Sequence, residues 1–272
     1  FLTDIASEKC LIDELLKEVD RQSVYVSYNG KSYDIPLINA RSIFNKCIGK
    51  LNKSNNIDLL HISRRFWREM LENYSLQNIE RNILKSNREG ELDIPGSEIP
   101  AAYFSYLDSR DATIMKNVIY HNKLDILSLT ILLEKINKVL LSKNYKNVNK
   151  FEIGRLYLQN EYLEQAISIF KSILEIDPNH LSATKELSFI YKRNEDLSQA
   201  CNLWLKAIEH DEYYAYVELA KWEEHKNKDY EKALKYTEKA LNSKFDDYIY
   251  EGEEIKKIKH RKRRLETLSK KI

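Results

Sequence analysis

The spacing of apolar and polar residues divides the chain into a mixed first part and a purely helical second part. In the first part, apolar residues at helical spacing predict one helix over Glu8–Val19 and a long one over Thr113–Leu141. Two apolar runs rich in β-branched or aromatic residues, Val24–Tyr28 and Ile57–Leu60, predict short buried strands. Three further helices are expected to open at Tyr33–Ile38, to run over Ser63–Leu71 and to start at Ser75–Glu80. This mixture indicates a small α/β domain over residues 1–143.

Residues 147–247 repeat themselves with a period of about 34 residues. Each copy has a small residue in its first helix and an alanine at the start of its second, because two helices cross closely only where side chains are small. The small positions are Gly154, Ser188 and Ala220, then Ala166, Ala200 and Ala233, and the large residues between hairpins are Tyr157, Phe170 and Trp204. The third copy has one extra residue near Lys226–Asp229.

These positions resemble the tetratricopeptide repeat, so we expect three helical hairpins that stack on one another. The resemblance implies a concave groove that binds a peptide or a partner protein. The alternative is that the repeats only support the neighbouring domain. With the first part, they predict an α/β plus all-α protein.

The composition limits the class of protein and its cellular setting but indicates no particular function. Hydrophobic residues make up 43% and charged residues 32% of the chain, which is typical of a folded protein and not of a disordered one. The three cysteines are far apart and form no Cys/His cluster, so neither a disulfide framework nor a zinc site is indicated. This use of cysteine favours a reducing setting, so we expect a cytoplasmic protein. No apolar run is long enough to span a membrane, so we expect no membrane partner.

The positive charge of the chain is concentrated in its last segment. Residues 248–272 hold nine basic and four acidic residues, a net charge of +5. An apolar stripe with Ile258 and Leu265 indicates a helix, which either contacts nucleic-acid phosphates or caps the last repeat. The candidate phosphate-binding residues are Lys256, Lys257, Lys259, Arg261, Lys262, Arg263 and Arg264.

One acidic residue interrupts the apolar face of the long helix. At 100° per residue, Asp125 falls within about 40° of a stripe that includes Val118 and Leu132. A buried carboxylate needs a cation, a set of hydrogen-bond donors or a metal ion. His121 lies one helical turn before Asp125, so the pair is either a metal-site fragment or an ordinary ion pair.

Two segments together resemble a nuclease family. Asn29-Gly30-Lys31-Ser32-Tyr33-Asp34, followed by His121-Asn122-Lys123-Leu124-Asp125, resembles two exonuclease motifs of the DEDD, or DnaQ-like, 3′–5′ exonucleases. The chain is most similar to the YprB-like branch of the ribonuclease H-like domains, over about residues 1–135. The segments Asp58–His61, Tyr74–Gln77 and Asp93–Leu107 also resemble that branch.

The resemblance implies a catalytic site that uses two Mg²⁺ or Mn²⁺ ions to cleave DNA or RNA. It makes Asp34 and Asp125 metal ligands, gives His121 the role of positioning water, and places Asn29 and Tyr33 against nucleic acid. Two more carboxylates are expected from an Asp-x-Glu on the first strand of the domain. That motif is absent here, since Asp229-Tyr230-Glu231 lies in the third repeat.

The chain opens at Phe1 and not at Met, and the resemblance places Phe1-Leu2-Thr3 at the end of a third strand. We therefore expect a fragment or a processed product that is inactive alone, with the first strands of its nuclease domain missing. Two hypotheses follow. The chain is either the C-terminal part of a nuclease fused to a partner-binding repeat module, or a non-catalytic adaptor that carries a decayed nuclease fold.

Overall fold

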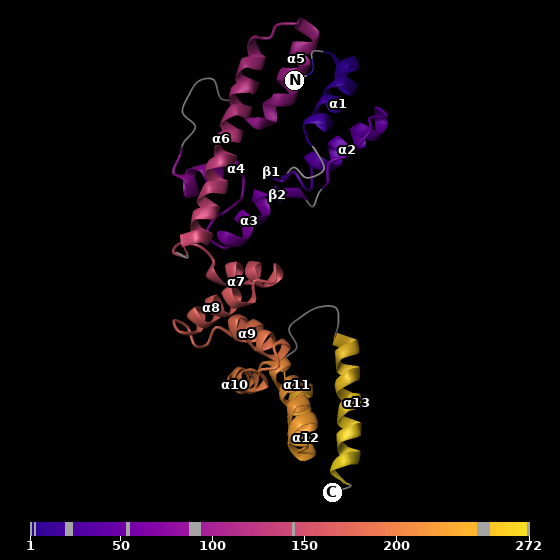
Figure 1. Cartoon of the computed structure of the whole chain (residues 1–272), viewed down its shortest axis with the longest axis vertical. Helices are drawn as coiled ribbons and strands as arrows, with labels where there is room; N and C mark the ends of the chain where they lie inside the picture. Colours follow the sequence, from indigo (N-terminus) through magenta and orange to yellow (C-terminus); the bar gives the residue numbers. More distant parts are fainter. Residues whose placement is uncertain are drawn as a thin grey trace. The chain divides into compact units, whose positions relative to one another are not determined.

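The computed structural model describes residues 2, 4–19, 24–52, 55–86, 94–142, 145–243 and 251–270. The chain forms two compact units, Phe1–Asn149 and Lys150–Ile272, whose elements are labelled in Figure 1. The first unit combines a small sheet with helices and the second is helical, which confirms the predicted class. Residues 143 and 247, where the predicted domains end, and residues 1 and 3 of the predicted third strand lie outside the described residues.

Two parallel strands form the sheet of the first unit in the part of the chain that the structure describes. They are β1 (Tyr25–Ser27) and β2 (Asn56–Asp58), with Val26 opposite Ile57. The Asn56 side chain, 3% exposed, joins them, because its Nδ2 donates to the carbonyl of Tyr25 and its Oδ1 accepts from Ser27 Oγ. Both strands are shorter than the sequence pattern predicts.

The helices of the first unit surround this pair of strands. They are η1 (Ile5–Ser7), α1 (Glu8–Glu18), α2 (Asp34–Phe44), α3 (Leu59–Phe66), α4 (Leu76–Ile79), the π-helical η3 (Glu80–Leu84), η4 (Gly96–Glu98), α5 (Ile99–Ser109) and α6 (Thr113–Ser142). The prediction of a helix over Ser63–Leu71 is wrong in position. Asp58 caps α3 with its side chain, so the helix begins four residues earlier and takes Leu59 and Leu60 from the predicted strand.

The core of the first unit brings together residues from three helices. Leu59 and Phe66 of α3, Ile79 of α4, and Met115 and Leu132 of α6 are at most 2% exposed. Elsewhere in the first unit, Glu8 of α1 accepts hydrogen bonds from Arg41 of α2 and from Asn45, the residue that follows α2. The Arg41 guanidinium holds the pKa of the Glu8 carboxyl below its usual value. This core therefore joins α3 and α4 to α6, from Met115 in the first turn of α6 to Leu132 beyond its middle.

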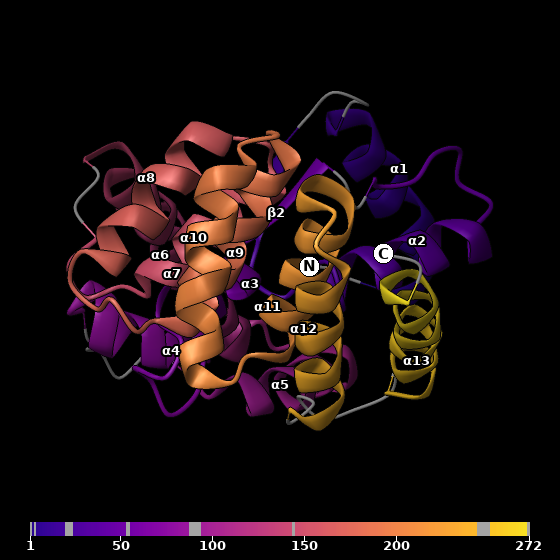
Figure 2. The same ribbon diagram turned by 90° about the horizontal axis from the view of Figure 1, so that it is seen from below.

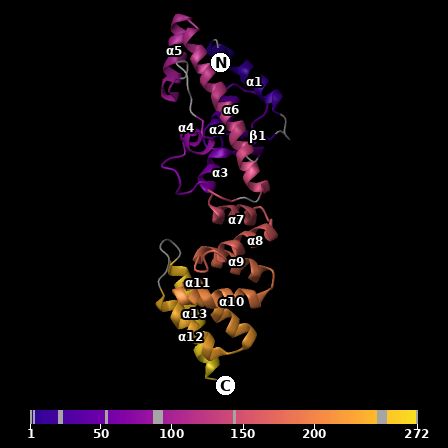
Figure 3. The ribbon, with the colours of Figure 1, turned by 90° about the vertical axis from the view of Figure 1, so that its left-hand side faces the viewer.

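The second unit is a series of helix pairs, and Figure 3 shows them following one another from α7 onward. The pairs are α7 (Lys150–Gln159) with α8 (Leu163–Leu174), α9 (Leu181–Arg193) with α10 (Leu197–Ala207), and α11 (Tyr213–Trp222) with α12 (Tyr230–Asn242). The five predicted small residues Ala166, Ser188, Ala200, Ala220 and Ala233 are 0% exposed, and Gly154 is buried too. The crossings therefore depend on these side chains, as the repeat predicts.

The extra residue of the third copy is accommodated by a π-helical turn over Glu223–Asn227. A π turn holds one more residue than an α turn, because each N–H bonds to the fifth carbonyl before it. Lys228 then takes a left-handed φ of 55°, and the Asp229 N–H bonds back to the Glu223 carbonyl at 3.0 Å. The insertion ends there, and Ala233 in the next helix keeps its buried position.

Ion pairs join the first helices of successive hairpins. Arg155 of α7 lies 3.8 Å from Glu186 of α9, and Lys192 of α9 lies 2.5 Å from Glu218 of α11. Burial alone would raise the pKa of Glu218, but hydrogen bonds from Lys192 and Lys221 outweigh it and lower that pKa. The carboxylate stays charged, and its contribution to stability is present above its ordinary pKa and lost as the pH falls.

The last helix, α13 (Glu251–Ser269), packs on α12, and Figure 2 shows the two side by side. Its Ile258 and Leu265 are 3% and 0% exposed. Arg261 and Arg264 both pair with Glu224, a buried carboxylate at the end of the third hairpin's first helix. This arrangement supports the capping role for the helix. No helix of the described residues is long and apolar enough to cross a membrane.

We expect Gly154→Ala to destabilise the second unit although alanine is the better helix former. A Cβ at this position would lie 2.6 Å from Phe170 Cε1 and 3.1 Å from Ile169 Cγ2, and both side chains are buried. The overlap should lower the free energy of unfolding by about 1–3 kcal/mol. Chemical denaturation of the 272-residue protein measures this change.

Gly252→Ala is the matched control, because a Cβ there meets no described atom within 4 Å. This substitution should be neutral or stabilise α13 by a few tenths of a kcal/mol. Equal stability of the two variants would show that the α7–α8 crossing does not need a glycine.

Candidate functional site

A buried carboxylate organises the segment between β1 and α2. Asp58, 3% exposed, accepts hydrogen bonds from the backbone N–H groups of Asn29 (2.8 Å), Lys31 (3.0 Å) and Leu60 (3.1 Å). The first two N–H groups belong to the β1–α2 loop and the third to the start of α3. One side chain therefore accepts hydrogen bonds from backbone N–H groups of both the loop and a helix N-terminus. His61 Nε2, 3.9 Å from Asp58 Oδ2, is half exposed and adds little to this arrangement.

Gly30 makes the loop turn tightly in front of α2. Asn29 before it has a left-handed φ of 68°, and the Gly30 carbonyl accepts from the Ile35 N–H at 2.9 Å. A Cβ on Gly30 would lie 2.3 Å from Ser27 Oγ and 3.5 Å from Asp34 Oδ2. The Asp34 carboxylate therefore lies close to the backbone of Gly30.

Asp34 is the first residue of α2 and is exposed to solvent. A carboxylate in the first turn of a helix interacts favourably with the helix dipole. Tyr33 beside it has 66% of its surface exposed, and Asn29 is exposed as well. The residues expected to contact nucleic acid near the site thus lie on an accessible surface.

The second predicted motif lies in the first half of α6. His121 and Asp125 lie one turn apart, with Nε2 3.6 Å from Oδ2. The expectation that Asp125 is buried in the apolar face is wrong in degree, because a third of its side chain is exposed. His121, expected at the edge of that face, is only 7% exposed. The stripe is placed as predicted, but the elements packed on α6 close over the imidazole and leave the carboxylate open.

The potential metal ligands of the described residues do not gather into one group. Within the described ranges, no group of three or more His, Cys, Asp or Glu side chains lies close enough to hold a metal ion. Mg²⁺ and Mn²⁺ prefer several oxygen ligands. The described residues therefore do not bring Asp34, His121 and Asp125 together as one group of potential metal ligands.

The basic residues of the tail fall into two sets on α13. Arg261 and Arg264 pair with Glu224, Lys262 pairs with Glu238 at 2.8 Å and Lys257 pairs with Glu254 at 2.8 Å. The other set is exposed on the helix and comprises Lys256, Lys259 and Arg263. Part of the tail's positive charge is thus already balanced by glutamates of the chain.

Comparison with protein families agrees with this architecture. A family model described as the RNase H superfamily matches residues 1–137, and a tetratricopeptide repeat model matches residues 149–180. The chain belongs to the ribonuclease H superfamily and carries a tetratricopeptide repeat behind that domain. Members of this superfamily generally use divalent metal ions. The predicted family resemblance is confirmed.

One curated relative is the uncharacterized protein YprB of Bacillus subtilis. It is 31% identical over 245 residues, which cover 87% of this chain and 59% of the relative. The chain therefore spans less than two thirds of the length of the relative that it matches.

Asp58 is the site residue whose role the sequence did not reveal. The available signal was its position, immediately after a strand and before a helix, where an aspartate commonly caps the helix. No pattern in the sequence indicates its hydrogen bonds with the Asn29 and Lys31 N–H groups, because those residues lie 29 and 27 positions away along the chain.

Asp58→Asn should lower the free energy of unfolding by at least about 2 kcal/mol. The asparagine keeps one acceptor oxygen, and its NH₂ group would face a backbone N–H donor. His61→Ala, which removes the half-exposed partner at 3.9 Å, should change stability by less than about 0.5 kcal/mol. Urea denaturation of both variants tests the assignment, and a large effect of His61→Ala alone would contradict it.

The two sets of tail residues should respond differently to substitution. Arg261→Gln leaves the buried Glu224 with less compensation and should lower the melting temperature without changing nucleic-acid affinity much. Replacing Lys256, Lys259 and Arg263 together with glutamine should leave the melting temperature unchanged. If the exposed set contacts phosphates, the slope of log affinity against log salt should fall by up to about 2.7 for duplex DNA. An unchanged slope would leave α13 with the capping role alone.

Proposed function

We propose that this chain is the C-terminal part of a metal-dependent 3′–5′ exonuclease-type protein that acts on DNA or RNA, with repeats that bind a peptide or protein partner. The observation that carries the proposal is the His121–Asp125 pair on α6. In a chain of the ribonuclease H superfamily, an accessible carboxylate one turn after a buried imidazole fits a metal ligand next to a group that holds water.

Asp34 fits the same role from the other segment. Its carboxylate is exposed, sits at a helix N-terminus and is held by a loop that Gly30 and Asp58 fix in place. We assign to Asp34 and Asp125 the places of two carboxylate ligands of Mg²⁺ or Mn²⁺, which would neutralise charge on the phosphate when bound. The remaining carboxylates would come from an Asp-x-Glu outside this sequence.

A non-catalytic adaptor is the second candidate, and one observation favours it. No set of three possible metal-binding side chains lies together in the described part of the chain. On this reading, the first unit supports the repeats, and the repeats bind the partner. The coding sequence upstream of Phe1 distinguishes the two, since the nuclease requires a strand with Asp-x-Glu there.

The catalytic proposal is tested with a 5′-labelled single strand and Mn²⁺ or Mg²⁺. The 272-residue chain should give no product ladder, whereas the protein extended by an upstream Asp-x-Glu strand should shorten the strand from its 3′ end. Losing a partner of a metal ligand costs about 10–100-fold, so Asp34→Asn or Asp125→Asn in the extended protein should reduce the rate at least about a hundredfold. Asp108→Asn, an exposed aspartate on α5, is the matched control and should leave the rate unchanged.

Two results would contradict this account. A metal-dependent ladder from residues 1–272 that Asp125→Asn abolishes would show that the chain is complete in itself. An extended protein that binds but never shortens the strand would support the adaptor.

A further inference from the structure

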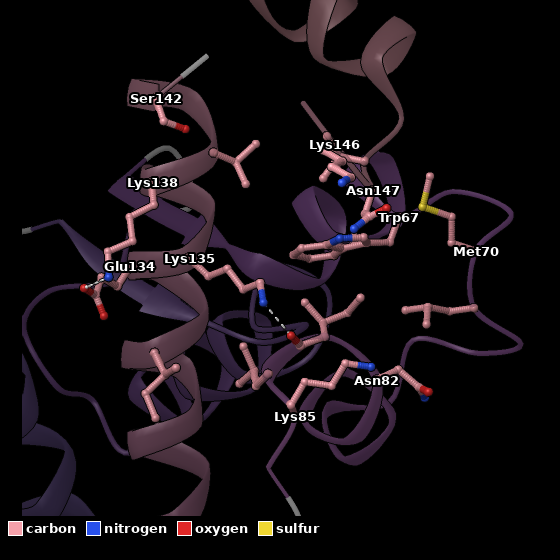
Figure 4. Close-up of a pocket in the computed structure, with 16 residues that line it drawn as sticks. Trp67, Met70, Asn82, Lys85, Glu134, Lys135, Lys138, Ser142, Lys146 and Asn147 are labelled. Atoms are coloured by element: carbon pink, nitrogen blue, oxygen red, sulfur yellow. Dashed lines mark hydrogen bonds and ion pairs between the residues drawn. The ribbon is translucent and has the colours of Figure 1, made fainter. Parts of the chain in front are cut away.

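A cavity of about 880 Å³ lies beside the second half of α6 in the first unit (Figure 4). Two of its lysines have partners in the chain. Lys135 donates across the cavity to the Ile83 carbonyl at 2.6 Å, and Lys138 pairs with Glu134 at 2.6 Å. These side chains therefore make contacts within the first unit, and a cleft of the second unit is built differently.

The second unit contains a cleft of about 560 Å³ between its first two helix pairs, which we call the α8–α10 cleft. One face of α8 and one face of α10 form its walls. Its floor is formed by Leu187 and Tyr191 of α9, which are 2% and 9% exposed. Every lining residue belongs to the stretch 145–243, which the structure describes without a gap. A volume of this size is typical of binding sites.

The next junction between helix pairs shows that the repeat does not require an open cleft. The small residues of the repeat align Tyr191 with Glu223 and Gln199 with Lys232. At the second junction Glu223 and Lys232 form an ion pair, and Glu223 is buried. At the first junction an aromatic ring and an amide stand in their place, and the space between the two walls stays open. The cleft is therefore a property of these particular side chains.

The lining combines an apolar centre with exposed amides. Leu174 of α8 and Leu203 of α10 lie above the floor, and Leu205 has 42% of its surface exposed. Gln199 and Asn202, both exposed on α10, offer amide donors and acceptors. Such amides match the N–H and C=O groups of an extended peptide, and the leucines match one large apolar side chain.

Two cations face the cleft, one from each wall. Lys171 of α8 and Lys206 of α10 are exposed, and neither forms an ion pair with a described residue. The Lys171 Nζ lies 5.7 Å from the centroid of the Tyr191 ring. Glu175 is the single acidic residue of the lining, so the cleft keeps an excess of one positive charge. This excess favours a partner that carries a carboxylate.

We propose that the α8–α10 cleft binds a short extended segment of a partner protein, with one large apolar side chain next to a carboxylate. The carboxylate would lie between Lys171 and Lys206, and the apolar side chain would lie on the leucines. From Gln199 to Lys206, α10 rises by about 10 Å, a length that three extended residues span. The proposal rests on the partner binding that we assigned to the repeats, and it specifies the surface and the chemistry of the partner.

The chemistry of the partner is tested by selecting peptides on the 272-residue protein. A library of displayed random heptapeptides is the probe, and the closed variant Tyr191→Glu with Gln199→Lys removes peptides that bind elsewhere. This variant introduces the ion pair of the second junction, which the chain already forms within the same repeat. The selected peptides should share one large apolar residue next to Asp or Glu.

A synthetic peptide of the selected sequence then measures each contribution to the affinity. Lys171→Gln with Lys206→Gln should weaken binding about three- to tenfold, the effect of two exposed charge contacts. Lys226→Gln with Lys235→Gln is the matched control, because it removes the same charge from exposed positions of the second unit outside the cleft. The control should leave the affinity unchanged. Serine in place of the apolar residue of the peptide should weaken binding at least about tenfold.

Glu175→Gln should change the affinity in the opposite direction. It removes the one carboxylate of the lining, so an acidic peptide should bind about two- to fivefold more tightly. A folding defect cannot produce a gain in affinity, and this variant therefore tests the charge argument even if the closed variant is unstable.

Selection that yields no shared sequence, or basic residues in place of acidic ones, would overturn the proposal. Equal effects of the cleft and control lysine variants would do the same. A dimer that Lys171→Gln with Lys206→Gln dissociates in sedimentation equilibrium would assign the cleft to a second copy of the chain. Peptides selected without the closed variant, whose binding no cleft variant changes, would keep partner binding by the repeats and remove only this cleft.

Discussion

The placement of the candidate site depends on the carboxylate of Asp58. A strand-to-helix loop that turns as tightly as Asn29–Lys31 leaves backbone N–H groups pointing inward, and buried donors without acceptors are costly. Asp58 accepts from two of them and from the first turn of α3. Because the two strands end in register at Ser27 and Asp58, the same residue that ends β2 closes the loop after β1. Asp34 is placed at the N-terminus of α2 by that loop, and Gly30 is required where the loop passes Ser27.

The helical unit follows a different constraint, the close approach of paired helices. Six small residues occupy the crossings, and large ones such as Phe170 and Trp204 fill the space between hairpins at 0% and 1% exposure. Ion pairs then compensate the acidic side chains that the helices bury. Glu218, Glu223 and Glu224 are almost fully buried, and lysines or arginines from neighbouring helices pair with each of them. Helix α13 takes part in this network through Arg261 and Arg264, which explains why a strongly basic segment packs against the chain.

Basic residues of α13 thus serve a structural purpose. On α13 several of them balance carboxylates that the repeats have buried. A basic residue is structural where, as here, the chain itself supplies the buried anion.

The sequence by itself determined the class, the family and the repeat, because these rest on local periodicity and on short motifs. The small residues at the helix crossings and the extra residue of the third copy are visible in the sequence. The structure accommodates the extra residue in a π-helical turn. The tertiary structure alone decided the partial exposure of Asp125 against the burial of His121 and the division of the basic tail into paired and exposed residues. Each of these depends on which distant segment covers a side chain. Such contacts join residues tens of positions apart, and neither spacing nor composition along the chain carries a signal for them.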